Sequence, residues 1–323
     1  MIACNTSSLP GLREADMSKP DTWDPDEIAQ FVRFYEVGVP EKEMLRLFPG
    51  KTVGQFRGKA INMQLHRSRP TGAYVLAANH PAVVRGRTMY PESVRDPRDA
   101  PELLPSGRNQ RKLGTRISKG PWAGFRIFSL TLEERATCPS SCHAYRNCMG
   151  NGMQFAARNA AGPALERLLS VELGRLQRTY PAGFAVRLHV LGDFYSVDYV
   201  AAWEHWLDEY PALHVFGYTA RDTSDPIGAA VLRLAKQRWD RFAIRLSSPD
   251  PAPERAITLW EMPNFSELKS RGIIVCPAEL GKTKGGGSCA LCWSPAARNK
   301  TIAFLAHGGR RGRKSNPEAV ASS

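Results

Sequence analysis

Short apolar runs recur along the C-terminal two thirds of the chain at a nearly constant step, and this recurrence limits the possible folds strongly. The last five of six such runs begin 28, 29, 30 and 29 residues apart. Short, wholly apolar strands are typical of a parallel sheet that helices cover. The six expected strands are 125–130, 185–191, 213–218, 242–246, 272–275 and 301–306.

Helix-like stretches separate these runs, and proline stands near the first turn of several, where its missing N–H costs nothing. They cover residues 163–178, 197–209, 226–238 and 263–270. A strand followed by a helix in about 29 residues is a βα unit. The sequence therefore predicts an α/β fold with a parallel βα repeat of about six strands. These strands would form part of a TIM-like barrel or an open sheet.

Composition divides the chain into five parts. Residues 1–20 form a polar leader that is expected to be disordered, and residues 21–66 form a small helical module. Residues 67–120 are rich in Pro, Gly and Arg, with eleven basic and four acidic side chains, and are expected to be a basic linker or a wrapped arm. The main α/β domain covers 121–308, and a basic tail covers 309–323.

The overall composition excludes several classes of protein. A hydrophobic content of 42% is too high for an intrinsically disordered chain. No apolar run reaches the roughly 18 residues that a membrane helix needs, and the leader lacks a signal-peptide core. We therefore expect a soluble, cytoplasmic protein with no membrane partner. The formal charge of +13, from 44 Lys and Arg against 31 Asp and Glu, favours a polyanionic partner such as DNA.

The small module carries three amphipathic segments, at 24–35, 40–47 and 53–65. Its first part holds seven acidic residues between 21 and 43, whereas 51–69 holds five basic residues and no acid. Arg, Lys, Gln and Asn side chains on a third helix suit a reader of the DNA major groove. The residues expected to contact DNA are Lys51, Gln55, Arg57, Lys59, Asn62, Arg67 and Arg69.

This module resembles known DNA-binding families. Trp23, the Asp-Glu pair at 26 and 27, a Tyr-x-x-Gly step and the segment Lys51-Thr-Val-Gly-Gln-Phe-Arg-Gly-Lys look like a Myb/SANT-type or GcrA-type helix-turn-helix. The resemblance covers about 45 residues and implies a three-helix helix-turn-helix domain that binds DNA. The alternative is a small solvated bundle that docks on the main domain or on another protein.

Six of the seven cysteines form two triplets. Clustered thiols in a chain without an export signal are typical of metal or iron–sulfur ligands, with structural or free thiols as the alternative. The first triplet follows the first expected strand and the second begins after the fifth, so both are expected on the face where the loops after parallel strands open. The triplets are Cys138, Cys142 and Cys148, and Cys276, Cys289 and Cys292.

Three thiolates leave one coordination position open on a tetrahedral metal or on one iron of a four-iron cluster. A C-x3-C loop after a first strand resembles the radical S-adenosylmethionine enzymes, although the family's usual third cysteine falls at Tyr145 here. The resemblance implies a 4Fe-4S cluster on the first triplet. It also implies that Gly192 and Asp193, after the second strand, bind S-adenosylmethionine, with Asp in place of the family's Glu. The second triplet would hold an auxiliary cluster or zinc.

The main domain is also similar to a phage and prophage family called gene product 88. The shared features are a Cys-Pro near the first strand, His-Val-x-Gly-Asp-Phe at 189–194, Tyr-Thr-x-Arg at 218–221 and Cys-x-x-Cys-Trp at 289–293. This similarity covers more than half of the chain. It implies a phage or prophage context and a cysteine-bound metal, but it names no reaction.

Three functions are consistent with these features. The first is an iron–sulfur enzyme, similar to the radical S-adenosylmethionine enzymes, that modifies nucleic acid or a DNA-bound protein. The second is a non-enzymatic DNA-binding regulator with a structural zinc or a redox-sensing cluster. The third is a zinc-stabilised adaptor that binds other proteins.

Overall fold

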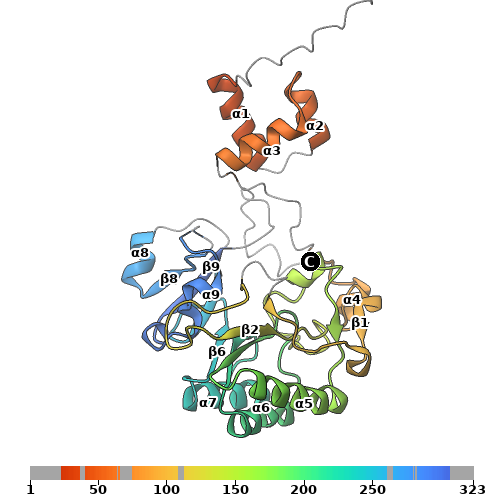
Figure 1. The fold of residues 1–323 in the computed structure, drawn as a ribbon. Coiled ribbons are helices and arrows are strands. Elements are labelled where there is room, and N and C mark those ends of the chain that lie inside the picture. The colour runs from red at the N-terminus through yellow and green to blue at the C-terminus, as the bar shows by residue number, and fades with distance from the viewer. Residues whose placement is uncertain are drawn as a thin grey trace, which may run out of the picture. The chain divides into compact units, whose positions relative to one another are not determined.

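The computed structural model divides the chain into two compact units, Met1–Arg69 and Pro70–Ser323. The larger unit is an α/β fold, drawn in Figure 1 with its helices and strands labelled. The expected leader and tail lie outside the described residues. The structure describes residues 23–36, 41–63, 65, 75–107, 113–259, 265–278, 280 and 282–305.

The smaller unit contains three short helices, α1 (Pro25–Glu36), α2 (Glu41–Leu47) and α3 (Val53–Asn62). Asp24 begins the first helix, because its carboxylate accepts the Glu27 N–H at 2.8 Å. Apolar side chains from all three helices and from the residues beside them form one core: Trp23, Phe31, Met44, Phe48, Phe56 and Ala60. The aromatic members of this core are in ring contact, so the unit has a hydrophobic core of its own.

A seven-stranded, all-parallel sheet forms the centre of the larger unit. Helices alternate with its strands along the chain, so the predicted α/β fold is confirmed. In spatial order the strands are β2 (Arg126–Ser129), β4 (Phe184–Leu188), β5 (Leu213–Thr219), β6 (Phe242–Ser247), β7 (Arg255–Leu259), β9 (Thr301–Leu305) and β8 (Ile273–Val275). No pairing joins the edge strands β2 and β8 within the described residues, and the sheet is open.

One strand of this sheet departs from the sequence-based expectation of about six. Strand β7 has the sequence Arg-Ala-Ile-Thr-Leu, in which Arg255 and Thr258 interrupt the apolar run that marks the other strands. It lies between β6 and β9, and β9 in turn separates it from β8. The step of 30 residues between the fourth and fifth expected strands therefore contains two strands in succession, β6 and β7, before β8 begins.

Helices α5 (Pro163–Thr179), α6 (Val197–Glu209) and α7 (Pro226–Gln237) lie side by side against one face of the sheet (Figure 1). The sequence begins two of them in the same way. The Ser196 hydroxyl accepts the Tyr199 N–H at 3.0 Å, and the Asp225 carboxylate accepts the Ile227 N–H at 2.8 Å. Side chains at alternate strand positions, such as Phe184 and Val186, form the main core with these helices.

The other face of the sheet has a separate apolar core. Ile127 and Ala185 contribute to it from the strands, and Trp122 and Trp293 cover it. The two indole rings are stacked, with centroids 5.6 Å apart and planes 6° from parallel. Trp293 belongs to a short 3-10 helix, Leu291–Trp293, that follows α9 (Gly286–Cys289). Cys289 and Cys292 of the second triplet are thereby attached to this face.

The expected linker or wrapped arm belongs to the larger unit over its described residues, 75–107 and 113–120. The segment contains α4 (Pro81–Val84) and β1 (Val94–Arg95), and β1 pairs in parallel with β3 (Arg158–Asn159). Leu103 and Leu104 are buried in the main core. Isolated apolar residues anchor this Pro- and Arg-rich segment to the core. The mean composition of the segment does not reveal them.

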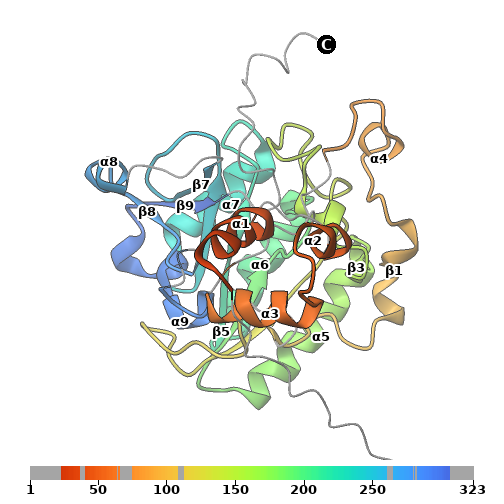
Figure 2. The same cartoon turned by 90° about the horizontal axis from the view of Figure 1, so that it is seen from above.

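The edges of the larger unit are formed by different parts of the chain. Helix α8 (Phe265–Ser270) and β8 lie at one side, and α4 and β1 lie at the opposite side in both views (Figures 1 and 2). Within the described residues, no helix combines the length and the apolar character that are needed to cross a membrane.

Candidate metal centre

The first cysteine triplet lies in a loop that follows β2. The loop is irregular, with short turns in which the Cys142 N–H donates to the Pro139 carbonyl at 3.1 Å and the Tyr145 N–H donates to the Cys142 carbonyl at 2.8 Å. The Gly150 N–H lies 3.4 Å from the Cys148 sulfur. All six cysteines of the two triplets are free thiols that are partly buried. Free thiols can lose a proton to form the thiolates that bind metals.

The three thiols of this loop lie close enough for their charges to interact. Burial raises the pKa of Cys142 to about 11, and the neighbouring Cys148 and Asp193 contribute to the rise. Burial also raises the pKa of Cys138, with further contributions from Asp193 and from both other thiols. The structure thus gathers the first triplet and Asp193 in one place, where ionised thiols without a compensating cation are disfavoured.

A buried ion pair supports the loop at its base. The Glu134 carboxylate accepts the Arg158 Nε–H at 2.6 Å and the Nη2–H at 3.1 Å, and neither side chain is exposed. Arg158 Nη2 also donates to the Gly150 carbonyl at 3.1 Å, just after the third cysteine. A Cβ atom on Gly150 would lie 2.8 Å from the Glu134 carboxyl carbon, so only glycine fits there. The pair ties the start of the loop to its end.

Two further charged side chains hold the same loop. Glu133 accepts two hydrogen bonds from Arg87, at 2.7 and 2.8 Å, and so connects the loop to the segment after α4. The buried Arg135 donates to the Tyr145 carbonyl at 3.1 Å and to the Asn151 side-chain oxygen. Sequence reasoning missed this network. Its signal is the run of three charged residues at 133–135, which follows an expected strand and ends three positions before the first cysteine.

Gly192 and Asp193 lie beside this loop, in the turn that follows β4. Gly192 has φ of +85°, and a Cβ there would lie 2.6 Å from Thr137 Oγ1 and 2.7 Å from Leu132 Cβ. The Asp193 N–H donates to the same Thr137 hydroxyl at 3.0 Å. The close approach between this turn and the residues before Cys138 therefore depends on glycine.

The Asp193 carboxylate is 3% exposed and already has backbone partners. One oxygen accepts the Phe194 N–H and the other accepts the Ala220 N–H, each at 2.8 Å. Burial raises the pKa of Asp193 to about 6, and these hydrogen bonds oppose the rise. Asp193 thus joins the turn after β4 to the turn after β5. A cosubstrate amino group at this carboxylate would share its oxygens with the backbone.

The second triplet is spread over three elements. Cys276 follows β8, where its N–H donates to the Ala303 carbonyl at 2.8 Å, while Cys289 ends α9 and Cys292 lies in the next 3-10 helix. The Cys292 sulfur accepts a hydrogen bond from the Tyr218 hydroxyl at 3.0 Å. The charge of Cys289 acts on the pKa of Cys292, which burial raises. The chain therefore returns from the sheet edge at β8 to bring Cys292 to β5.

Two arginines flank Cys292 on the same face of the sheet. Arg245 is fully buried, and its guanidinium donates to the carbonyls of Cys292 at 2.8 Å, Lys300 at 2.9 Å and Ala297 at 2.8 Å. The Arg187 guanidinium lies 4.7 Å from the Tyr218 ring centroid. Burial lowers the pKa of both arginines, and the nearby Cys292 opposes this effect.

The sequence holds a signal for this pair of arginines that the sequence reasoning missed. Strand β4 reads Phe-Ala-Val-Arg-Leu and β6 reads Phe-Ala-Ile-Arg-Leu, with one arginine at the same position of each. Arg187 pairs with Phe216 of β5, and Arg245 pairs with Tyr218 two residues further along. Burial of a charged arginine in an apolar strand is energetically costly, so its presence there indicates a specific hydrogen-bonding or charged partner.

The arrangement of the side chains limits the predicted metal site in one respect. Across the parts of the chain that the structure describes, no group of three or more His, Cys, Asp or Glu side chains is arranged to hold a metal ion. The first triplet is gathered by its loop, but its sulfurs do not converge to coordination distance. The two triplets have different neighbours, with Asp193 and Arg135 beside the first and Tyr218 and Arg245 beside Cys292.

The expected DNA-binding residues of α3 differ in their surroundings. The Lys51 amine pairs with Glu27 at 3.1 Å and lies 4.6 Å from the Trp23 ring centroid, and Lys59 lies 5.5 Å from the same ring. The Gln55 side chain accepts the Thr52 N–H at 2.7 Å in a capping box. Arg57 and Asn62 are exposed. The expected contacts Arg67 and Arg69 lie outside the described residues.

No protein-family model, no curated protein and no solved structure matches the chain. The functional interpretation therefore rests on the residues and their arrangement.

Proposed function

We propose that the α/β unit binds a thiophilic metal or an iron–sulfur cluster through Cys138, Cys142 and Cys148, and that the protein acts on or at nucleic acid. The observation that carries the proposal is the gathering of three free, partly buried thiols in one loop, which lies beside Asp193 and is held by the buried Glu134–Arg158 pair.

The donor set fits such a group chemically. Three thiolates and a nearby carboxylate repel one another when ionised, and a bound cation removes this repulsion. A cation of this kind would draw the sulfurs together from their present positions, since the loop is built from turns rather than from a helix or strand. Three ligands leave one position open, at which a bound cluster or metal would supply Lewis-acid or redox chemistry.

The second triplet is proposed as an auxiliary metal site or cluster site. Arg187 and Arg245 place two positive charges near Cys292, and Tyr218 donates a hydrogen bond to its sulfur. Outer groups of this kind stabilise thiolate charge and orient ligands. Cys276 and Cys289 would complete the set.

S-adenosylmethionine remains a proposed cosubstrate of the first site. The turn of Gly192 and Asp193 adjoins the cysteine loop through the Thr137 hydroxyl, which supports a cosubstrate position there. Replacing Asp193 by Asn keeps one of the two side-chain oxygens that accept backbone N–H groups and removes the negative charge. Equilibrium dialysis should show weaker S-adenosylmethionine binding, while unchanged binding would remove Asp193 from the proposed site.

The nucleic-acid part of the proposal is supported by the smaller unit. Its three short helices have a common core, and its third helix exposes Arg57 and Asn62. The chain's formal charge of +13 favours a polyanionic partner. The same helices support the alternative of a non-enzymatic DNA-binding regulator, in which the cysteines hold a structural zinc or a redox-sensing cluster.

Metal analysis after anaerobic purification tests the proposal. Iron, acid-labile sulfide and zinc would be measured in the full chain, in a variant with Cys138, Cys142 and Cys148 replaced by Ser, and in a Cys4→Ser control. We expect metal in the wild type and the control, and a loss of one metal or cluster in the triple variant. Iron with sulfide supports the enzyme, and zinc alone supports the regulator. Equal metal content in all three proteins would overturn the proposal.

A further inference from the structure

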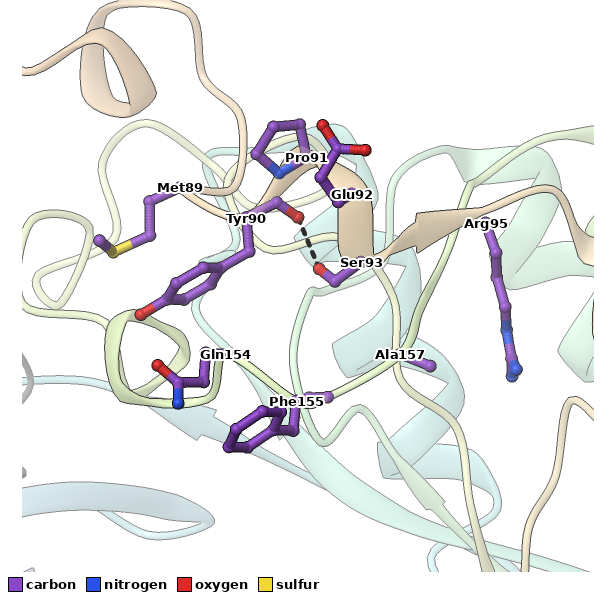
Figure 3. A pocket seen from close by; sticks show the side chains of 10 residues that line it. Met89, Tyr90, Pro91, Glu92, Ser93, Arg95, Gln154, Phe155 and Ala157 are labelled. Carbon is purple, nitrogen blue, oxygen red and sulfur yellow. Dashed lines mark hydrogen bonds between the residues drawn. The ribbon is translucent and has the colours of Figure 1, made fainter.

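A large pocket lies beside the cysteine loop, outside the residues proposed to bind metal. Its volume is about 550 Å³, and it is open to solvent. The segment around β1 forms one wall, and residues 154–157, just after the cysteine loop, form the other. Figure 3 shows the rings of Tyr90 and Phe155 at one end of this pocket and Arg95 at the other. A pocket of this size fits a group as large as a nucleotide.

Phe155 is the most unusual residue of the pocket, because 93% of its surface is exposed. The chain on either side of it is nevertheless held in place. The buried Arg158 guanidinium donates to the Met153 carbonyl at 3.2 Å and to the Ala156 carbonyl at 2.7 Å. A large apolar ring on a held loop is a preorganised surface, which binds a partner at a low cost in conformational entropy.

Tyr90 is held equally firmly. Its hydroxyl donates to the Asn151 carbonyl at 2.5 Å, and the Arg158 guanidinium lies 5.3 Å from its ring centroid. The same Arg158 forms the ion pair with Glu134 at the base of the cysteine loop. The aromatic pair and the candidate metal loop therefore depend on one buried arginine.

Polar side chains line the remainder of the pocket. Gln154 and Glu92 are exposed; the Gln154 amide lies near the two rings, whereas the Glu92 side chain points away from them (Figure 3). The Arg95 guanidinium is held by the Asn159 side-chain oxygen at 2.8 Å and the Glu102 carbonyl at 3.1 Å, which fixes a positive charge at the end of the pocket away from the rings. The pocket thus combines aromatic surface, an amide, a carboxylate and a cation.

We propose that this pocket receives the base of an unpaired nucleotide in a single-stranded or flipped-out segment. The base would stack on Phe155, as bases stack on aromatic side chains in single-strand binding proteins. The Gln154 amide, which both donates and accepts hydrogen bonds, would pair with the polar edge of the base. Arg95 would hold a phosphate at the other end.

This inference deepens the proposed function, because it names the part of a nucleic acid that the α/β unit holds. It rests on that function for the nucleic-acid partner and is independent of the bound metal. The chemistry favours a nucleotide over an apolar peptide side chain, since an apolar anchor would leave the positive charge of Arg95 without a role.

Fluorescence anisotropy with labelled single-stranded dA, dC and dT oligomers of about 12 nucleotides tests the inference on the full chain. We expect binding of all three oligomers, because stacking on an aromatic ring tolerates every base. Phe155→Ala should weaken binding of all three by about tenfold. Phe155 is exposed, so the fold is retained.

Val171→Ala is the matched control, because Val171 is an apolar side chain with 70% exposure on α5 that does not line the pocket. It should bind all three oligomers as the wild type does. Equal single-strand affinity of wild type and Phe155→Ala would overturn the inference, and that is the result expected if Phe155 contacts a protein partner instead. Metal content measured on the same samples separates this result from a failure of the metal proposal.

Discussion

The Tyr218 ring on β5 meets the Phe304 ring on β9 edge to face, with centroids 5.5 Å apart and planes 88° from parallel. Strands β6 and β7 lie between these two strands, and adjacent strands are about 4.8 Å apart, so a flat sheet would separate the two rings widely. The sheet therefore curls strongly toward the face that carries Cys292, Arg187 and Arg245. The candidate auxiliary site lies on the concave side of this open sheet.

Trp293 should be a main source of stability on this concave side. It is 2% exposed, stacks on Trp122, and lies 4.4 Å from Phe216 between ring centroids. We expect Trp293→Ala to lower the free energy of unfolding by about 3 to 5 kcal/mol, because a large cavity replaces the indole. Urea unfolding followed by circular dichroism measures the change. A loss below about 1 kcal/mol, comparable to that of an exposed substitution, would show that the concave face is loosely packed.

Glu134→Gln should destabilise the loop that holds the first triplet. The substitution leaves the buried Arg158 without its countercharge, which costs about 3 to 5 kcal/mol in buried pairs. We also expect faster alkylation of Cys138, Cys142 and Cys148, measured by mass spectrometry of peptides after timed iodoacetamide treatment. Glu204→Gln, which breaks an exposed pair with Arg233, is the control. Equal alkylation rates in the two variants would contradict a supporting role for Glu134.

Gly192→Ala should be far more harmful than the same change at Gly152. Gly192 has φ of +85° and a Cβ would lie 2.7 Å from Leu132 Cβ, whereas a Cβ on Gly152 meets nothing within 4 Å. Strain and overpacking together predict a loss of about 2 to 5 kcal/mol at Gly192, against about 0.5 kcal/mol at Gly152. Thermal unfolding of both variants checks this. Similar melting temperatures would show that the turn after β4 can move away from Thr137.

His189 should make the protein sensitive to acid. Burial, with a contribution from Arg187, lowers the pKa of His189 to about 3, so the folded state holds it neutral. The unfolded chain binds the proton near pH 6.5, and the stability associated with neutral His189 is present above that pH and is lost as pH falls toward 3. Between pH 6.5 and 5 the wild type should lose about 2 kcal/mol through this group.

Urea unfolding of wild type and His189→Gln at both pH values isolates this effect. The comparison is needed because Asp193 acts in the opposite direction. Its pKa is raised to about 6 in the folded state, so its contribution is present at low pH and is lost as pH rises through 6. The variant should show a smaller decrease at pH 5 than the wild type. The same pH dependence in both proteins would contradict the prediction.

Arg57 and Lys51 should have separable roles in the smaller unit. Arg57→Ala should weaken duplex DNA binding and reduce the slope of log affinity against log salt by about 1, as expected for one lost phosphate contact. Lys51→Met should mainly destabilise the unit, by about 1 kcal/mol, because Lys51 pairs with Glu27 and lies over Trp23. Salt titrations and unfolding curves measure the two effects. An unchanged salt slope in Arg57→Ala would favour the protein-docking alternative.

Much of the fold was predictable because local sequence and tertiary structure agree. The apolar runs at β4, β5 and β6 and the helices between them follow from side-chain periodicity, and α6 has the same bounds as predicted. Strand β7 was not predictable in this way, because Arg255 and Thr258 interrupt its apolar pattern. Its place is decided by pairing with β6 and β9, which are distant in the sequence.

The candidate site, like the fold, was predictable only in part. The sequence alone determined that six cysteines form two triplets after strands and that the helices alternate with parallel strands. Only the tertiary structure decided that Glu134 and Arg158 support the first triplet, that Cys292 returns to Tyr218, and that the sheet curls until Tyr218 meets Phe304. These contacts join residues far apart along the chain, and local periodicity carries no information about which distant side chains burial will bring together.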